Sequence, residues 1–408
     1  MWTRAAAAYD RTVGGGARTR LESTVGLTRD LAVTGGGGLE VARQHRMAAI
    51  IAAEEFGDPE LTARVIGAYD VPAIWTRSDD PGLARQIVAA AERALSSLPG
   101  GPPHDAARAR LLATIALEMR GTRSPRGPQA AREAETIARR LDDPALLAFA
   151  LNGAFMQSCT RAGLAARRDG IGEELVALAT RHGLATFEIL GHLIRLQARG
   201  ALSDFATADA HATAVDRLAE RHERPLVSVF TGWYAALRLA ATGSAPAPEM
   251  ETAYRSAAAR LDGAGMPGLE HGLLPLALLS VPLVNGPPPP GQDGPHVDPD
   301  ADWGPYRPWA EPFALLQAGR RAKAGSALRA LPEPPADLTY EALCCLEAAA
   351  ALELDDRDVL ERAHTRLLPA AGELAGAGSG LLTLGPVDRW LARITSALES
   401  PRTRSTRS

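Results

Sequence analysis

The sequence contains few of the residues from which metal sites and covalent chemistry are usually built. It has three cysteines and a single lysine, Lys323, among 408 residues. Two of the cysteines, Cys344 and Cys345, are adjacent, so the chain offers neither a C-x-x-C metal-ligand pair nor an even set of disulfide partners. A reducing, cytoplasmic compartment fits this cysteine content best.

Long hydrophobic runs and net positive charge are also missing. The longest apolar run, residues 273–284, is shorter than the roughly 20 residues of a membrane-spanning helix and contains two prolines. The opening residues, MWTRAAAAYDRTV, have no apolar core behind a basic end, so we expect no secretory signal. Because the formal charge is −4 and the pI is near 6.2, we expect no membrane contact and no direct nucleic-acid binding by this chain.

Strand-forming residues are scarce, whereas helix-forming residues are abundant. Aromatic residues make up 5% of the chain, and 79 of its residues are alanine, the strongest helix former. We therefore predict an all-α fold. The basic residues other than Lys323 are 43 arginines, a skew typical of a GC-rich genome, so their number alone does not indicate an arginine-built binding site.

Local patterns indicate where individual helices run and begin. Within residues 85–98, one helical stripe is apolar, formed by Ile87, Ala91, Ala94, Leu95 and Leu98. Three Asp-Pro pairs place a carboxylate where it can accept the first free amides of a helix, followed by a proline that needs no amide partner. These predicted helix starts are Asp58-Pro59, Asp80-Pro81 and Asp143-Pro144.

A short turn sequence recurs along the first two thirds of the chain. Successive turns lie 39 to 43 residues apart, a period typical of an α-solenoid built from helix pairs. We predict a tetratricopeptide-like solenoid of antiparallel helix pairs over residues 37–284, with units longer than the roughly 34 residues of the standard repeat. The residues that anchor these turns are Phe56, Leu98, Leu141, His182, His222 and Leu261.

Proline and glycine divide the remaining chain. Residues 285–309 are too rich in both to continue a helix, so they are predicted to form a linker. Its Trp303, Tyr306 and Trp309 either offer a partner surface or hold the linker against the solenoid. The predicted organisation is a helical lead-in at 1–36, the solenoid, this linker, C-terminal helical repeats at 310–400, and a solvated tail at 401–408. The C-terminal helices are expected at 310–331, 336–353, 356–371 and 385–399.

Several motifs approach a catalytic or ligand-binding pattern without completing it. Glycine runs at 14–16 and 35–38 precede helical sequence as a phosphate loop would. Neither run is followed directly by the lysine that such a loop needs, because the single lysine is Lys323. The acidic residues of 296–302 alternate like calcium ligands, but Trp303 stands where an EF-hand needs glycine. The serine of GAGSG at 376–380 is one place late for a nucleophile elbow. We therefore predict no catalytic residue, no cofactor and no metal, and a protein that is not an enzyme.

One loop departs from the helical pattern in a way that suggests recognition. Residues 68–80 combine Tyr69, Asp70, Trp75 and Arg77, and Trp, Tyr and Arg are the residues most often found as interface anchors. We predict that these four residues form a partner or ligand surface. The alternative is that the two rings pack an irregular joint between repeats.

Three segments resemble a known family of regulators. Residues 60–81 (ELTARVIGAYDVPAIWTRSDDP), 107–122 (ARARLLATIALEMRGT) and 378–391 (GSGLLTLGPVDRWL) are similar to the C-terminal tetratricopeptide region of large SARP/AfsR-type actinobacterial antibiotic regulatory proteins. The resemblance implies a transcription regulator of secondary metabolism. Large members also carry DNA-binding, transcriptional activation and nucleotide-binding domains, none of which can be identified here, so neither ATP nor promoter binding is transferred to this chain.

Two functions remain open from the sequence. The first is a non-catalytic repeat module of such a regulator, which transmits a signal by contacting a protein partner or the regulator's own nucleotide-binding and DNA-binding domains, and which could form a homo-oligomer. The second is a sensor that binds a small molecule in the solenoid groove near Tyr69, Trp75 and Arg77.

Overall fold

The computed structural model describes residues 17–35, 37–285 and 295–400, and these residues form helices with short connections. No strand occurs in these ranges, which confirms the prediction of an all-α fold. Within the same ranges, no helix is both long enough and apolar enough to cross a membrane. The glycine run at 14–16 and the tail at 401–408 lie outside the described residues.

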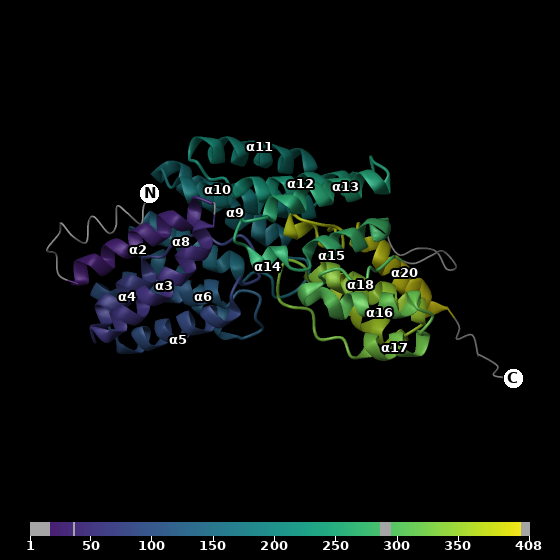
Figure 1. Ribbon diagram of the computed structural model, residues 1–408, viewed down its shortest axis with the longest axis horizontal. Coiled ribbons are helices and arrows are strands. Elements are labelled where there is room, and N and C mark those ends of the chain that lie inside the picture. The colour runs from purple at the N-terminus through teal and green to yellow at the C-terminus, as the bar shows by residue number, and fades with distance from the viewer. Residues whose placement is uncertain (1–16, 36, 286–294, 401–408) are drawn as a thin grey trace.

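The helices follow one another in antiparallel pairs (Figure 1). Those of the first part of the chain are α2 (Ala17–Val33), α3 (Gly38–Glu55), α4 (Pro59–Gly67), α5 (Pro81–Ser97), α6 (Asp105–Glu118), α7 (Arg126–Ala138), α8 (Pro144–Met156), α9 (Ala165–His182), α10 (Ala185–Ala201), α11 (Phe205–Arg221), α12 (Val227–Thr242) and α13 (Ala247–Ala258). The later helices are α14 (Pro267–Glu270), α15 (Leu273–Ser280), α16 (Arg307–Gln317), α17 (Arg321–Arg329), α18 (Tyr340–Leu354), α19 (Arg357–Leu367) and α20 (Val387–Glu399).

The predicted Asp-Pro helix starts are confirmed. The carboxylate of Asp58 accepts the amides of Glu60 and Leu61 at the start of α4, at 3.0 and 3.1 Å. Asp80 and Asp143 each accept one amide, at 2.9 Å, at the starts of α5 and α8. Each carboxylate accepts hydrogen bonds from amides that have no partner within the helix, and this stabilises the start of each of the three helices.

Packing along the chain has the character of a helical repeat. Each helix from α2 to α12 contacts the next one, and α2, α3, α4 and α6 also contact the second helix along. The six turn anchors lie at or within three residues of the C-terminal ends of α3, α5, α7, α9, α11 and α13. Every second helix thus ends at an anchor, although a repeat period of about forty residues stays a prediction.

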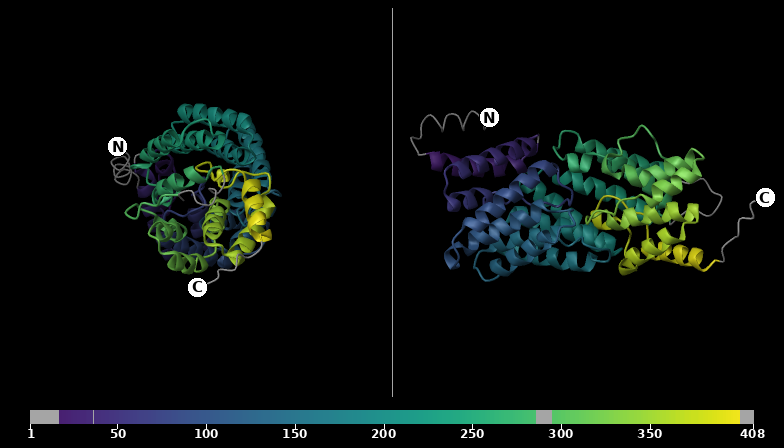
Figure 2. Two further views of the ribbon diagram at one scale, coloured as in Figure 1. Left: turned by 90° about the vertical axis from the view of Figure 1, so that its right-hand side faces the viewer. Right: turned by 90° about the horizontal axis from the view of Figure 1, so that it is seen from below.

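The helices curve round a central region that irregular segments of the chain cross, as the end-on view in Figure 2 shows. Arg43 on α3 donates to the carbonyl oxygen of Gly265 at 2.9 Å, so the first helix pair meets the segment after α13. The amide of Leu374 donates to the carbonyl oxygen of Ala201 at 2.7 Å, which joins the C-terminal segment to the end of α10. The chain therefore closes on itself at these two contacts.

The C-terminal third differs from its predicted form in two respects. The helix expected over 310–331 is two helices, because α16 ends at Gln317 and Gly319 adopts a left-handed conformation (φ 69°) before α17 begins. From residue 295 on, the expected linker is part of the core, since its three aromatic side chains are 1 to 5% exposed. These rings are Trp303, Tyr306 and Trp309, and all three belong to the hydrophobic core and do not form an exposed surface.

Candidate ligand-binding cavity

The segment 68–80 is the irregular connection between α4 and α5, and three distant parts of the chain hold it in place. The buried Asn152 side chain on α8 bonds both backbone groups of Ala73, at 2.9 and 2.7 Å. Trp75 Nε1 donates to the carbonyl oxygen of Gly268 at 3.0 Å, and Thr76 Oγ1 accepts the amide of Leu338 at 3.1 Å. The segment is therefore a rigid element inside the superhelix.

Of the four predicted site residues, the structure brings three together. Tyr69, Trp75 and Arg77 line one cavity, and the two rings are only 8 and 6% exposed. Asp70 does not line this cavity. Its carboxylate instead lies 2.9 Å from Arg29 Nε, and burial raises the pKa of Asp70. With so little surface exposed, the rings cannot project from the protein as anchors for a partner, and they face the interior instead.

The cavity measures about 230 Å³ and is partly open to solvent. Its walls come from the end of α2, α3, the segment 68–80, α5, α6, α8, α10, the start of α12 and the residues around α14. Ligand sites are typically concave and apolar with a few polar groups, and this cavity has that character. Its apolar walls include Leu39, Ile74, Leu190, Phe230 and Leu269.

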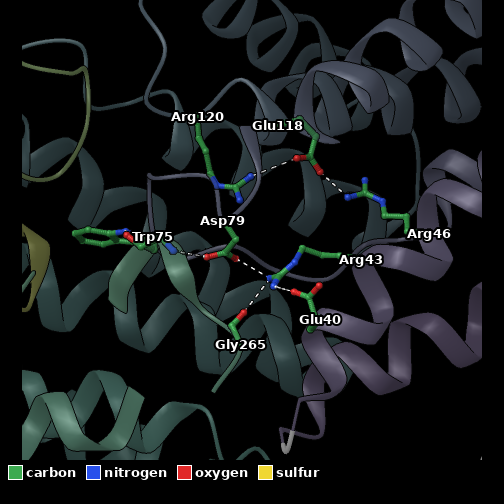
Figure 3. Close-up of polar contacts among 9 residues, drawn as sticks. Glu40, Arg43, Arg46, Trp75, Asp79, Glu118, Arg120 and Gly265 are labelled. Carbon is green, nitrogen blue, oxygen red and sulfur yellow. Dashed lines mark hydrogen bonds and ion pairs between the residues drawn. The ribbon is translucent and has the colours of Figure 1, made fainter. Parts of the chain in front are cut away.

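Glu118, at the end of α6, forms one of two charged groups at the cavity (Figure 3). Its carboxylate lies 2.5 Å from Arg46 Nη1 and 3.5 Å from Arg120 Nη1, and its side chain is 11% exposed. Burial would raise the pKa of Glu118, but the two guanidinium groups outweigh it and lower this pKa below its usual value. Arg46 also lies 4.1 Å above the ring of Tyr69, which is a cation–π distance.

Arg43 is the centre of the second charged group, also drawn in Figure 3. It pairs with Glu40 on the same helix and lies 3.1 Å from the carboxylate of Asp79. Asp79 also accepts the amide of Gly268 at 3.0 Å, and burial raises its pKa. These contacts join α3, the segment 68–80 and the start of α14 at one edge of the cavity.

Two further arginines of the cavity lining form no ion pair within the described residues. The guanidinium carbon of Arg77 lies 5.0 Å from the ring centroid of Tyr306, and its buried Nη1 has no hydrogen-bond partner in the described part of the chain. Arg224 donates to the carbonyl oxygen of His222 at 2.7 Å, while its buried Nε has no described partner. A second cavity of about 440 Å³ shares Arg77, Glu118 and Arg120 with the first.

The sequence did not identify five charged residues of this cavity. They lie on α3, at the end of α6 and before α12, and nothing in their spacing distinguishes them from the rest of a chain with 43 arginines. Only the closing of the superhelix brings them together. These residues are Arg43, Arg46, Glu118, Arg120 and Arg224.

The other motifs of the sequence lie apart from the cavity. Cys344 and Cys345 are fully buried in α18, and burial raises the pKa of both thiols. Ser379 of GAGSG is also buried and donates to the carbonyl oxygen of Gly376 at 2.6 Å. Within the described residues, no group of three or more His, Cys, Asp and Glu side chains could hold a metal ion.

Comparisons of this chain with protein-family models, with curated proteins and with solved structures find no match.

Proposed function

We propose that this chain binds a small molecule in the cavity beside the segment 68–80 and acts as a ligand sensor. The supporting observation is the cavity itself, which is largely apolar, contains charged groups and is assembled from parts of the chain up to 237 residues apart, from Ala32 to Leu269. Such a combination of apolar walls with a few polar groups is typical of small-molecule sites.

Ligand binding in this cavity could be transmitted through the closure of the superhelix. The cavity walls include both α3, in the first helix pair, and the residues around α14, which meet it at Gly265. A ligand that contacts both walls stabilises the closed form relative to any form in which they separate. The output would be a change in the outer helical surface available to a partner.

The family resemblance supports a regulatory setting for this sensor. Two of the three similar segments, 60–81 and 107–122, contribute Tyr69, Trp75, Arg77, Glu118 and Arg120 to the cavity lining. In a SARP/AfsR-like regulator, the sensor would act on the nucleotide-binding and DNA-binding domains. A direct partner contact through the concave face is less well supported, because the chain's own segments occupy that face.

An uncharged fluorescent probe tests the proposal. N-phenyl-1-naphthylamine should bind the native chain with an increase in fluorescence, and it should raise the melting temperature because a ligand of the folded state stabilises that state. Ala73→Phe places a ring in the cavity wall and should weaken this binding at least tenfold. Ala314→Phe is the matched control, because Ala314 is also partly buried but lies on α16, away from both cavities.

Two results would contradict the proposal. One is the absence of saturable probe binding to the native chain. The other is equal binding by the folded Ala73→Phe variant and its control, since the probe would then be bound elsewhere on the protein.

A further inference from the structure

The charged residues of the cavity lining are not balanced. Five arginines and three acidic residues line it, which leaves a formal excess of two positive charges. The lining acids are Asp79, Asp80 and Glu118, and the lining arginines are Arg43, Arg46, Arg77, Arg120 and Arg224.

Each acid already has partners within the protein. Glu118 lies between two arginines, and Asp79 accepts from Arg43 and from the amide of Gly268. Asp80 caps α5 by accepting the amide of Leu83. A cationic ligand would have to displace one of these contacts, so the cavity is poorly suited to it.

The positive excess lies on Arg77 and Arg224. Arg77 forms no ion pair with Asp337, although its charge partly offsets the burial that raises the pKa of that carboxyl group. Asp337 already accepts the amide and the hydroxyl of Thr339, at 2.8 and 2.6 Å. Arg224 donates to backbone oxygens only. Each guanidinium has a buried nitrogen without a partner in the described ranges, an arrangement that costs stability until an acceptor arrives.

Resting on the proposed function, we infer that the ligand is an organic anion whose apolar body fills the cavity and whose carboxylate, sulfonate or phosphate group is bound by Arg77 and Arg224. Guanidinium groups match such oxyanions because their planar array of donors can form paired, charge-assisted hydrogen bonds. The apolar walls at Ile74, Leu190 and Phe230 distinguish this ligand from inorganic phosphate, which would leave them uncovered.

Two probes with one skeleton separate charge from shape. 8-Anilinonaphthalene-1-sulfonate is N-phenyl-1-naphthylamine with a sulfonate added, so the pair differs in the anionic group alone. Arg77→Met and Arg224→Met keep an unbranched apolar side chain and remove the charge. Each should weaken binding of the sulfonate probe roughly tenfold, or about 1.4 kcal/mol, and leave binding of the uncharged probe within twofold. Arg108→Met is the matched control, because Arg108 is partly buried, donates to one backbone oxygen and lies outside both cavities.

The native chain provides a second measurement that needs no variant. Raising the salt concentration from about 0.02 M to about 0.5 M screens the guanidinium charges. It should weaken binding of the sulfonate probe and leave the affinity for the uncharged probe unchanged. If both probes bind with the same salt dependence, or if the arginine variants fold and bind the sulfonate probe normally, the anion inference is wrong while the proposed function stands. If neither probe binds in the cavity, the proposed function fails as well.

Discussion

Glu118 shows how much the cavity depends on single residues. Two arginines that no sequence pattern linked to it, Arg46 and Arg120, lie against its carboxylate. Their side chains are only 10 and 13% exposed, so water cannot replace the carboxylate if it is lost. The residue types could be read from the sequence, but which charges would be buried together could not.

Neutralising this carboxylate should destabilise the protein strongly. We expect Glu118→Gln to lower the free energy of unfolding by about 3 kcal/mol, because it leaves two buried guanidinium groups without their counter-ion. Glu135→Gln is the control, since Glu135 pairs with Arg139 where the two side chains are 31 and 44% exposed, and its loss should cost under about 1 kcal/mol. Urea denaturation measures both, and equal losses would contradict the assignment of Glu118 as a buried ion-pair centre.

Individual helices were the part of the fold most readable from the sequence. The Asp-Pro pairs predicted three helix starts, since capping depends on neighbouring residues and not on distant ones. The break at Gly319 was missed because the apolar spacing of 310–331 continues through it. Contacts between helices were not readable, and the pair of histidines between α10 and α11 is an example.

His192 on α10 and His211 on α11 bring their Nδ1 atoms within 2.8 Å of each other. Burial lowers the pKa of both rings, that of His211 to about 4, and the neighbouring His192 also lowers the pKa of His211. The charged groups that act on the pair are Glu188, Arg195, Arg217, Asp169 and Arg199. Because the folded pKa lies below the unfolded value, the unfolded chain binds protons first as the pH falls.

This pair should make the fold sensitive to acid. Its stabilising contribution is complete above about pH 6.5 and is lost as the pH falls toward 4, by roughly 1 kcal/mol because the rings are only half-buried. Urea midpoints measured between pH 7.5 and 5 should fall less steeply for His211→Asn than for the native chain. The exposed His182→Asn is the control and should follow the native curve; an unchanged slope in His211→Asn would refute the assignment.

The closure of the superhelix is the property on which the cavity depends at the scale of the whole molecule. Trp75 makes one of its links by donating to the carbonyl oxygen of Gly268, and Arg43 makes another at Gly265. Both links join residues about 200 positions apart, so neither could be inferred from the sequence. The prediction of an all-α fold of the helical-repeat kind was correct, whereas the irregular segments that cross its central region were not predicted.

Removing the Trp75 link should loosen this closure. Trp75→Phe keeps an aromatic ring and loses the indole donor, so we expect faster amide hydrogen exchange across residues 263–272. Trp233→Phe is the control, because the buried Trp233 Nε1 has no partner among the described residues and its loss removes no such bond. Exchange mass spectrometry that showed the same protection of 263–272 in both variants would refute a role for Trp75 in closure.

The amino-acid sequence by itself determined the helices, their caps and their succession in pairs, because these depend on composition and on residues within a few positions of each other. Only the tertiary structure decided that α3 and the segment 68–80 meet the residues around α14, that Tyr69 and Trp75 are buried, and that five arginines and three acids line one cavity. The physical reason is that local propensities act over a few residues, whereas burial of charge and apolar surface is set by how distant segments pack.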